Sequence, residues 1–217
     1  MRKKVGFIGC YSNDVILMLA KVLSCMGQKV LLWDRNKLRT LGVSVPKPEG
    51  VYPAQTRIEY DGILFTEQEY CTAEDCDIML IDFGMEADRK EASGCTELIL
   101  LTDMLLHHIR RLQREDIPRH SVKVCVIRDA TEQLCKGEKE VTEFLKLFPN
   151  RREFFLAPDA RDIKNRYVCE TAHEYSIRKA SPEMQETIYG IAELLCPEYT
   201  GKEMEKTVKK AERRAYR

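Results

Sequence analysis

Short apolar runs alternate with longer apolar or amphipathic stretches along most of this chain. Residues 5–9 form an apolar run that ends in glycine, which is typical of a buried strand. Residues 15–26 are apolar on nearly every face and predict a buried helix, and residues 29–34 predict a second buried strand. Two apolar strands joined by a buried helix form a β-α-β unit, so we expect a parallel sheet.

The same alternation continues through the rest of the chain. Asp61-Gly62 stands between two short apolar runs and favours a two-residue hairpin turn. Ser181 followed by Pro182 predicts the start of a helix. Further strands are expected at 77–82, 97–102, 122–127 and 153–156, further helices at 103–115 and 138–148, and a proline-rich surface loop at 42–57. The pattern predicts a doubly wound α/β domain with a mostly parallel sheet flanked by helices, whose ligand crevice lies at the carboxyl ends of the strands.

Composition excludes several classes of protein. The chain has 217 residues, of which 44% are hydrophobic, and a formal net charge of zero. These values are ordinary for one packed domain, and they argue against disorder, a collagen-like chain or a dedicated nucleic-acid binder. No apolar stretch reaches the length of a membrane span, and the first apolar run is too short for a signal peptide.

The zero net charge conceals an asymmetry. The last sixteen residues contain seven basic and three acidic side chains, a net charge of +4, which leaves −4 on the remainder. We therefore expect a body over residues 1–201 and a basic helical tail over residues 202–217. The basic candidates for interaction are Lys206, Lys209, Lys210, Arg213 and Arg214. The tail is interpreted as solvated or as docked on an acidic patch of a partner or of the body, and the alternative is a membrane-surface helix.

Nine cysteines occupy positions 10, 25, 71, 76, 95, 125, 135, 169 and 196. Their odd number and the absence of a C-x-x-C pair argue against a secreted disulfide framework, so we expect reduced thiols in a cytoplasmic protein. Cys71 and Cys76 have no second pair to complete a zinc set. His107 and His108 are adjacent in an expected helix and point about 100° apart, so we interpret them as surface or half-buried histidines rather than ligands of one metal.

The turn after the first strand is where this type of fold would hold a phosphate. After Gly9 it contains Ser12, Asn13 and Asp14, with no further glycine and no lysine. A carboxylate at Asp14 would occupy the positive end of the helix and would repel a phosphate by about 1–4 kcal/mol. Ser12 and Asn13 can hydrogen-bond a ligand, but helix capping is their simpler role. The turn therefore predicts no tight triphosphate binding in the usual pose.

These residues resemble the opening of the MinD and ParA group of P-loop ATPases, in the SIMIBI class. In that group a strand, a K-G-G-x-G-K-[ST]-[ST] loop, a helix containing L-A-x-x-L-x-x-x-G and a strand ending in V-L-L-x-D follow one another. Here the helix and the second strand, which ends at Asp34, match the pattern, and weaker similarity extends over residues 3–195. The loop is about three residues shorter and lacks both lysines, the inner glycines and the Ser/Thr that would hold magnesium, so it resembles a degenerate Walker A loop.

The resemblance implies a P-loop NTPase fold and a candidate vestigial nucleotide site. By position, Asp34 and Asp82 correspond to the two acids that lie beside magnesium and the attacking water in that group. The candidate site residues are Gly9, Ser12, Asn13, Asp34 and Asp82. The resemblance also implies a homodimer and a positioning, pilus-assembly or secretion-associated context, as in the CpaE-like branch.

A second resemblance is to the Rossmann start of 3-hydroxyacid dehydrogenases related to 6-phosphogluconate dehydrogenase. It rests on residues 5–9 and 30–36, and it implies that Asp34 binds a ribose hydroxyl or Arg35 a 2′-phosphate. The second and third glycines of that motif are absent, and the turn is about two residues longer.

The leading hypothesis is a catalytically inactive MinD/ParA-like homologue in the bacterial cytoplasm. It would act by protein interaction or regulation in a pilus, secretion or positioning system, without a cofactor and without specific nucleic acid. One alternative is an atypical nucleotide-binding enzyme, either an ATPase or an NAD(P)-dependent oxidoreductase that uses Asp34 and Arg35. The other is a membrane-surface scaffold that uses the basic tail.

Overall fold

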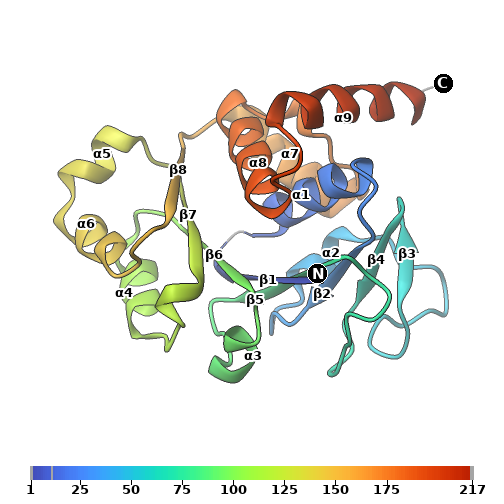
Figure 1. The fold of residues 1–217 in the computed structure, drawn as a ribbon, viewed down its shortest axis with the longest axis horizontal. Helices are drawn as coiled ribbons and strands as arrows, with labels where there is room; N and C mark the ends of the chain where they lie inside the picture. Colours follow the sequence, from blue (N-terminus) through green and yellow to red (C-terminus); the bar gives the residue numbers. More distant parts are fainter. Residues whose placement is uncertain (1, 11, 216–217) are drawn as a thin grey trace.

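The computed structural model describes residues 2–10 and 12–215, with side chains as far as Ala211. Within them lies one eight-stranded sheet in the order β3-β4-β2-β5-β1-β6-β7-β8 (Figure 1). Every neighbouring pair is parallel except β3 and β4. The strands are β1 (Lys3–Gly9), β2 (Val30–Asp34), β3 (Ile58–Tyr60), β4 (Ile63–Thr66), β5 (Ile78–Gly84), β6 (Glu97–Thr102), β7 (Val122–Arg128) and β8 (Arg152–Leu156).

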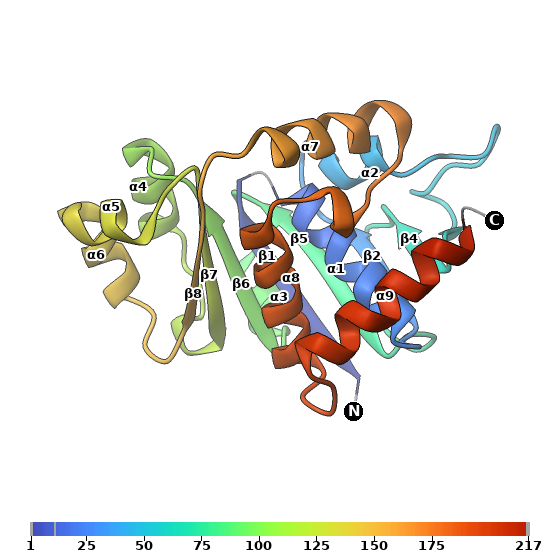
Figure 2. The ribbon, with the colours of Figure 1, turned by 90° about the horizontal axis from the view of Figure 1, so that it is seen from above.

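Helices cover both faces of this sheet, which confirms the predicted doubly wound architecture. Helices α1, α8 and α9 pack on one face, which faces the viewer in Figure 2, and α3, α4 and α6 pack on the other (Figure 1). The helices are α1 (Asn13–Cys25), α2 (Thr40–Ser44), α3 (Arg89–Ser93), α4 (Leu106–Arg114), α5 (Glu132–Gly137), α6 (Lys139–Lys146), α7 (Ala160–Ala172), α8 (Pro182–Leu195) and α9 (Gly201–Ala215). Because central strands are buried on both faces, consecutive residues such as Phe7 and Ile8 enter opposite cores.

The structure confirms the predicted hairpin turn and the predicted start of helix α8. Asp61 and Gly62 both have positive φ, 54° and 74°, as the hairpin turn requires. Ser181 caps α8, since its Oγ accepts a hydrogen bond from the Met184 amide at 3.0 Å. The expected loop at 42–57 is wrong at its start, because α2 extends through Ser44.

Helix α7 has no counterpart in the sequence prediction. Its buried positions are Asp162, Asn165 and Cys169, whereas the apolar Ile163 and Tyr167 are exposed. Two of the three inward positions are polar, so no apolar stripe marks the helix. Asp162 is satisfied by the amide and hydroxyl of Ser181, at 2.8 Å and 2.6 Å, which ties α7 to the start of α8.

The basic tail folds as α9 and docks on the body. Met204 and Val208 are fully buried in the core that also contains α1 and α8. The packing of Met204 and Val208 argues against the membrane-surface alternative, because these apolar side chains are not available to a bilayer while α9 is docked. Within the described part of the chain, no helix is long and apolar enough to cross a membrane. Lys206, Lys209 and Lys210 are exposed on α9, and the side chains of Arg213 and Arg214 lie outside the described residues.

Candidate functional site

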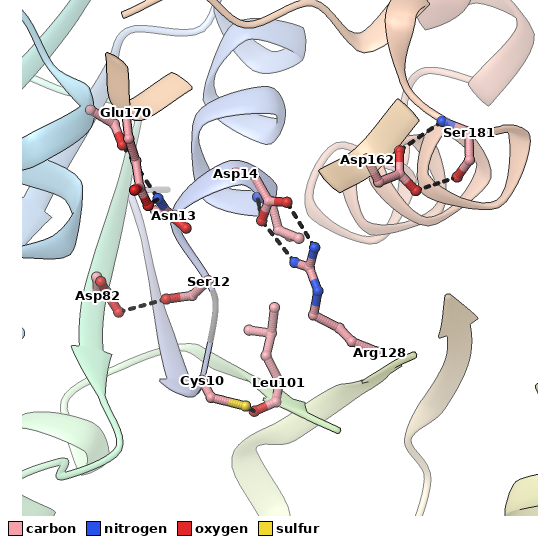
Figure 3. Close-up of polar contacts among 12 residues, drawn as sticks. Cys10, Ser12, Asn13, Asp14, Asp82, Leu101, Arg128, Asp162, Glu170 and Ser181 are labelled. Carbon is pink, nitrogen blue, oxygen red and sulfur yellow. Dashed lines mark hydrogen bonds and ion pairs between the residues drawn. The ribbon is translucent and has the colours of Figure 1, made fainter. Parts of the chain in front are cut away.

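The candidate site lies at the carboxyl edge of the sheet, where β1, β2 and β5 end side by side. Asp34 is the last residue of β2 and stands in register with Asp82 on the parallel strand β5. Ser12 immediately precedes α1, and its side chain turns toward β5 (Figure 3). Three of the five predicted site residues are therefore brought together, which follows from the parallel topology.

Asp82 is fully buried, and its carboxylate accepts four hydrogen bonds from the chain itself. Its Oδ1 accepts from the Ser12 hydroxyl and the Gly84 amide, both at 3.0 Å. Its Oδ2 accepts from the Thr40 hydroxyl at 2.9 Å and the Asn36 amide group at 3.2 Å. A carboxylate has about four lone-pair positions, so the bonding capacity of Asp82 is filled.

Ser12 does not cap α1, although capping was the simpler sequence interpretation. Its backbone is already helical, with φ −88° and ψ −21°, and its side chain makes no capping hydrogen bond. An N-cap residue needs extended backbone to bend its oxygen toward the first amides of the helix. The hydroxyl of Ser12 instead donates to Asp82.

Asp34 is also fully buried, and both of its oxygens accept hydrogen bonds from nearby backbone amides. The Asn36 amide donates to Oδ1 at 3.0 Å and the Gly42 amide to Oδ2 at 2.9 Å. Burial raises the pKa of Asp34 to about 7; the two amides oppose this shift and the charge of Asp82 adds to it. The paired acids therefore carry less than two full charges near neutral pH.

This raised pKa predicts a pH-dependent stability. The native pKa of Asp34, about 7, exceeds the unfolded value of 3.8, so the native state binds this proton more tightly. The stabilisation is present at pH 5 and is lost as the pH rises through 7. We expect Asp34 to lower the free energy of unfolding by about 2–3 kcal/mol between pH 5 and pH 8. Urea unfolding at both pH values gives the change in the free energy of unfolding for the wild type and for Asp34→Asn. The difference between these two changes is the contribution of Asp34.

The matched control for this experiment is Asp75→Asn, because Asp75 is exposed. It should keep the wild-type pH dependence. An equal change in the free energy of unfolding between the two pH values in Asp34→Asn and the wild type would contradict the raised pKa of Asp34.

The charge of Asp14 is neutralised inside the protein. Asp14 is fully buried, and its two oxygens accept hydrogen bonds from Nη1 and Nη2 of Arg128, at 2.7 Å and 2.8 Å (Figure 3). Arg128 is the last residue of β7 and is itself buried. This corrects the expected repulsion of phosphate by Asp14, since the sequence argument treated the carboxylate as unpaired.

Asn13 and Gly9 have structural roles in this arrangement. Asn13 Nδ2 donates to the Ser44 hydroxyl at 3.3 Å and to the Glu170 carboxylate at 3.1 Å, so it joins α1 to α2 and α7 rather than facing the buried acids. Gly9 has φ +138°, and a Cβ there would lie 1.7 Å from the Leu101 carbonyl oxygen. Gly9 is therefore packed against β6, and Asn13 links three helices.

The sequence did not identify Asn36, Thr40, Arg128 or Glu170 as part of this network. The contact between Asp34 and the Asn36 backbone has a local origin, because an aspartate in a turn often accepts a hydrogen bond from the backbone amide two residues on. The other three come from elements that the pattern could not place beside the first turn.

The contacts of Arg35 do not favour the dehydrogenase alternative. Its guanidinium forms two hydrogen bonds with Glu91, at 2.7 Å and 3.2 Å, and lies 5.3 Å from the centre of the Trp33 ring. Both oxygens of Asp34 are taken by backbone amides. The two side chains are thus engaged within the protein rather than presented to a ribose or a 2′-phosphate.

A second group of polar side chains lies at the ends of β1 and β6. It consists of Cys10, Asp103 and His108, and one ligand-type atom from each lies within 4.8 Å of the others. His108 is half-buried, as expected, and its Nδ1 is 2.9 Å from both Asp103 oxygens. Burial raises the pKa of the Cys10 thiol to about 12. None of the nine cysteines, all within the described residues, forms a disulfide, in line with the expected free thiols.

No family model and no curated protein matches this sequence. Solved structures do match its fold. A ParA family ATPase from Chlorobium tepidum is 12% identical with a TM-score of 0.61, over 88% of this chain and 99% of that one. McdA from Cyanothece, in complex with ATP, is 12% identical with a TM-score of 0.62, over 89% and 96%. MinD in the Aquifex aeolicus MinC:MinD cell division complex is 9% identical with a TM-score of 0.57, over 96% and 95%. The chain therefore has the fold of the ParA and MinD P-loop ATPases.

Proposed function

We propose that this protein is a ParA/MinD-fold component of the bacterial cytoplasm that acts through protein contacts and neither binds nor hydrolyses ATP. In this role it would serve as a regulatory or interaction subunit of a pilus, secretion or positioning system. The observation that carries the proposal is the closed hydrogen-bond network around Asp82 and Asp34.

Magnesium and a nucleotide do not fit the residues present. Magnesium requires oxygen ligands in near-octahedral geometry, and it is usually held through carboxylates, water and substrate phosphates. Asp82 already accepts four hydrogen bonds and Asp34 two, and neither side chain is exposed. The three residues between β1 and α1 include no lysine and no glycine. Binding would require both carboxylates to exchange internal partners for the ion.

Exposed apolar side chains support a role in protein contacts. Ile163 and Tyr167 are 54% and 67% exposed on α7, and Val43 is 53% exposed on the adjoining helix α2. Large exposed apolar side chains near one another are characteristic of surfaces that bind other proteins. Lys206, Lys209 and Lys210, which are exposed on α9, offer a separate cationic surface for an acidic partner. A homodimer through the α2 and α7 surface is compatible with the proposal.

Calorimetric titration with ATP and ADP, each with magnesium, tests the proposal together with a phosphate-release assay. We expect no heat of binding at micromolar nucleotide, no phosphate release, and no rise in Tm, since a ligand that binds only the native state must stabilise it. Micromolar binding or turnover that disappears in Asp34→Ala or Asp82→Ala, and persists in the exposed control Asp75→Ala, would overturn it.

A further inference from the structure

We propose that Cys10, Asp103 and His108 form a zinc site at the carboxyl edge of the sheet. The cluster lies on the opposite side of β1 from the Asp34 and Asp82 network. The proposal does not depend on whether the protein binds nucleotide.

The topology of the sheet brings these three residues together. Cys10 directly follows β1 and Asp103 directly follows β6, and the two strands are parallel neighbours in which Gly9 pairs with Leu101. The residues that follow the strand ends therefore emerge side by side. His108 lies in the first turn of α4, which starts just after Asp103 and returns the imidazole to the Asp103 carboxylate.

The donor set matches the preference of zinc. Zinc binds thiolate sulfur, imidazole nitrogen and carboxylate oxygen in tetrahedral sites, at about 2.0–2.3 Å. Such bond lengths separate neighbouring ligand atoms by roughly 3.3–3.7 Å. The three donor atoms lie within 4.8 Å of one another, and the closest contact, Nδ1 of His108 to Asp103, is 2.9 Å. Small rotations of these side chains would place all three at bonding distance from one ion.

Burial and access both suit a bound ion. Cys10 and Asp103 are buried, and the thiol makes a weak contact with the Leu101 carbonyl, at 4.0 Å (Figure 3). Asp103 is held in place by the Leu105 amide at 2.9 Å. His108 is partly exposed, so solvent or a ligand can reach the fourth position. A set of three protein ligands with one open position is the arrangement of reactive rather than purely structural zinc sites.

Metal titration of the reduced, metal-free protein tests the site. We expect one equivalent of Zn²⁺ to bind and Co²⁺ to give tetrahedral visible bands with a near-ultraviolet thiolate-to-metal charge-transfer band. Cys10→Ser should abolish the charge-transfer band, and both Cys10→Ser and His108→Gln should weaken Zn²⁺ binding by more than about 100-fold, because even outer-shell changes cost about 10–100-fold. The matched controls are Cys95→Ser, at a similarly buried thiol, and His107→Gln, at the adjacent exposed histidine.

Three outcomes would overturn the proposal. These are no binding of Zn²⁺ at micromolar concentration to the folded wild type, a charge-transfer band that persists in Cys10→Ser, or a band that is lost in Cys71→Ser instead. If Cys10→Ser does not fold, as judged by near-ultraviolet circular dichroism, the partly exposed His108 decides the question. Unchanged Zn²⁺ affinity in folded His108→Gln then also excludes the site.

Discussion

Replacement of Arg128 by methionine is expected to lower the free energy of unfolding by about 3–5 kcal/mol, because it leaves the Asp14 carboxylate buried without its cation. Both side chains are almost completely buried, and their two hydrogen bonds are 2.7 Å and 2.8 Å long. Methionine is shorter than arginine, but it is unbranched and flexible and fills the space along the aliphatic stem of Arg128, which limits the share of the loss that comes from packing. Urea unfolding at pH 7 measures the change.

The double variant Asp14→Leu with Arg128→Met separates the charge from the packing. Replacing a buried ion pair by apolar side chains of similar volume is often neutral or even stabilising. We therefore expect the double variant to recover most of the stability lost in Arg128→Met. A loss below about 1 kcal/mol in the single variant, or no recovery in the double one, would contradict a buried ion pair at this position.

The ion pair between Asp14 and Arg128 changes the physical argument against phosphate binding. The sequence placed a negative charge at the start of α1 and predicted repulsion, but Arg128 neutralises it. The case against nucleotide binding therefore rests on the filled bonding capacity of Asp82 and the buried position of Asp34, together with the short turn after β1. The proposed absence of ATPase activity therefore rests on the hydrogen-bond geometry of the site and not on electrostatic repulsion.

The sheet could be predicted because its signal is local. Central strands are buried on both faces, so each of them is a short run of apolar residues that is visible without knowledge of its neighbours. The hairpin at Asp61-Gly62 and the start of α8 at Ser181 depend on turn and cap chemistry within four residues. Helix α7 escaped prediction because Asp162 and Asn165 face inward, and their partners Ser181 and Ser176 come from later in the chain.

The candidate site also contains residues that local sequence signals could predict and contacts that they could not. Asp34 and Asp82 could be located, because each lies at the carboxyl end of a predicted strand. The long-range contacts could not be predicted, since the Ser12 to Asp82 hydrogen bond spans 70 residues and the Arg128 to Asp14 pair spans 114. Two side chains so far apart in the sequence can be recognised as partners only after the strand order is known.

Gly9→Ala is expected to lower the free energy of unfolding by about 4 kcal/mol or more, because the added Cβ would lie 1.7 Å from the Leu101 carbonyl oxygen. The clash is with backbone of the neighbouring strand β6, so no side-chain rotation can relieve it, and φ +138° adds backbone strain for any residue with a Cβ. Only a local separation of β1 from β6 makes room. Loss of soluble protein or a strongly lowered urea midpoint would be the measured result.

The matched control is Gly137→Ala at the end of α5, where an added Cβ meets no atom within 4 Å. Alanine favours helix over glycine by about 1 kcal/mol, so this variant should be neutral or slightly more stable. If Gly9→Ala were as stable as Gly137→Ala, the close approach of β1 and β6 would be wrong. Because the strain arises entirely within the folded chain, the expected loss also assigns Gly9 to strand packing, and no bound phosphate is needed to explain a glycine at this position.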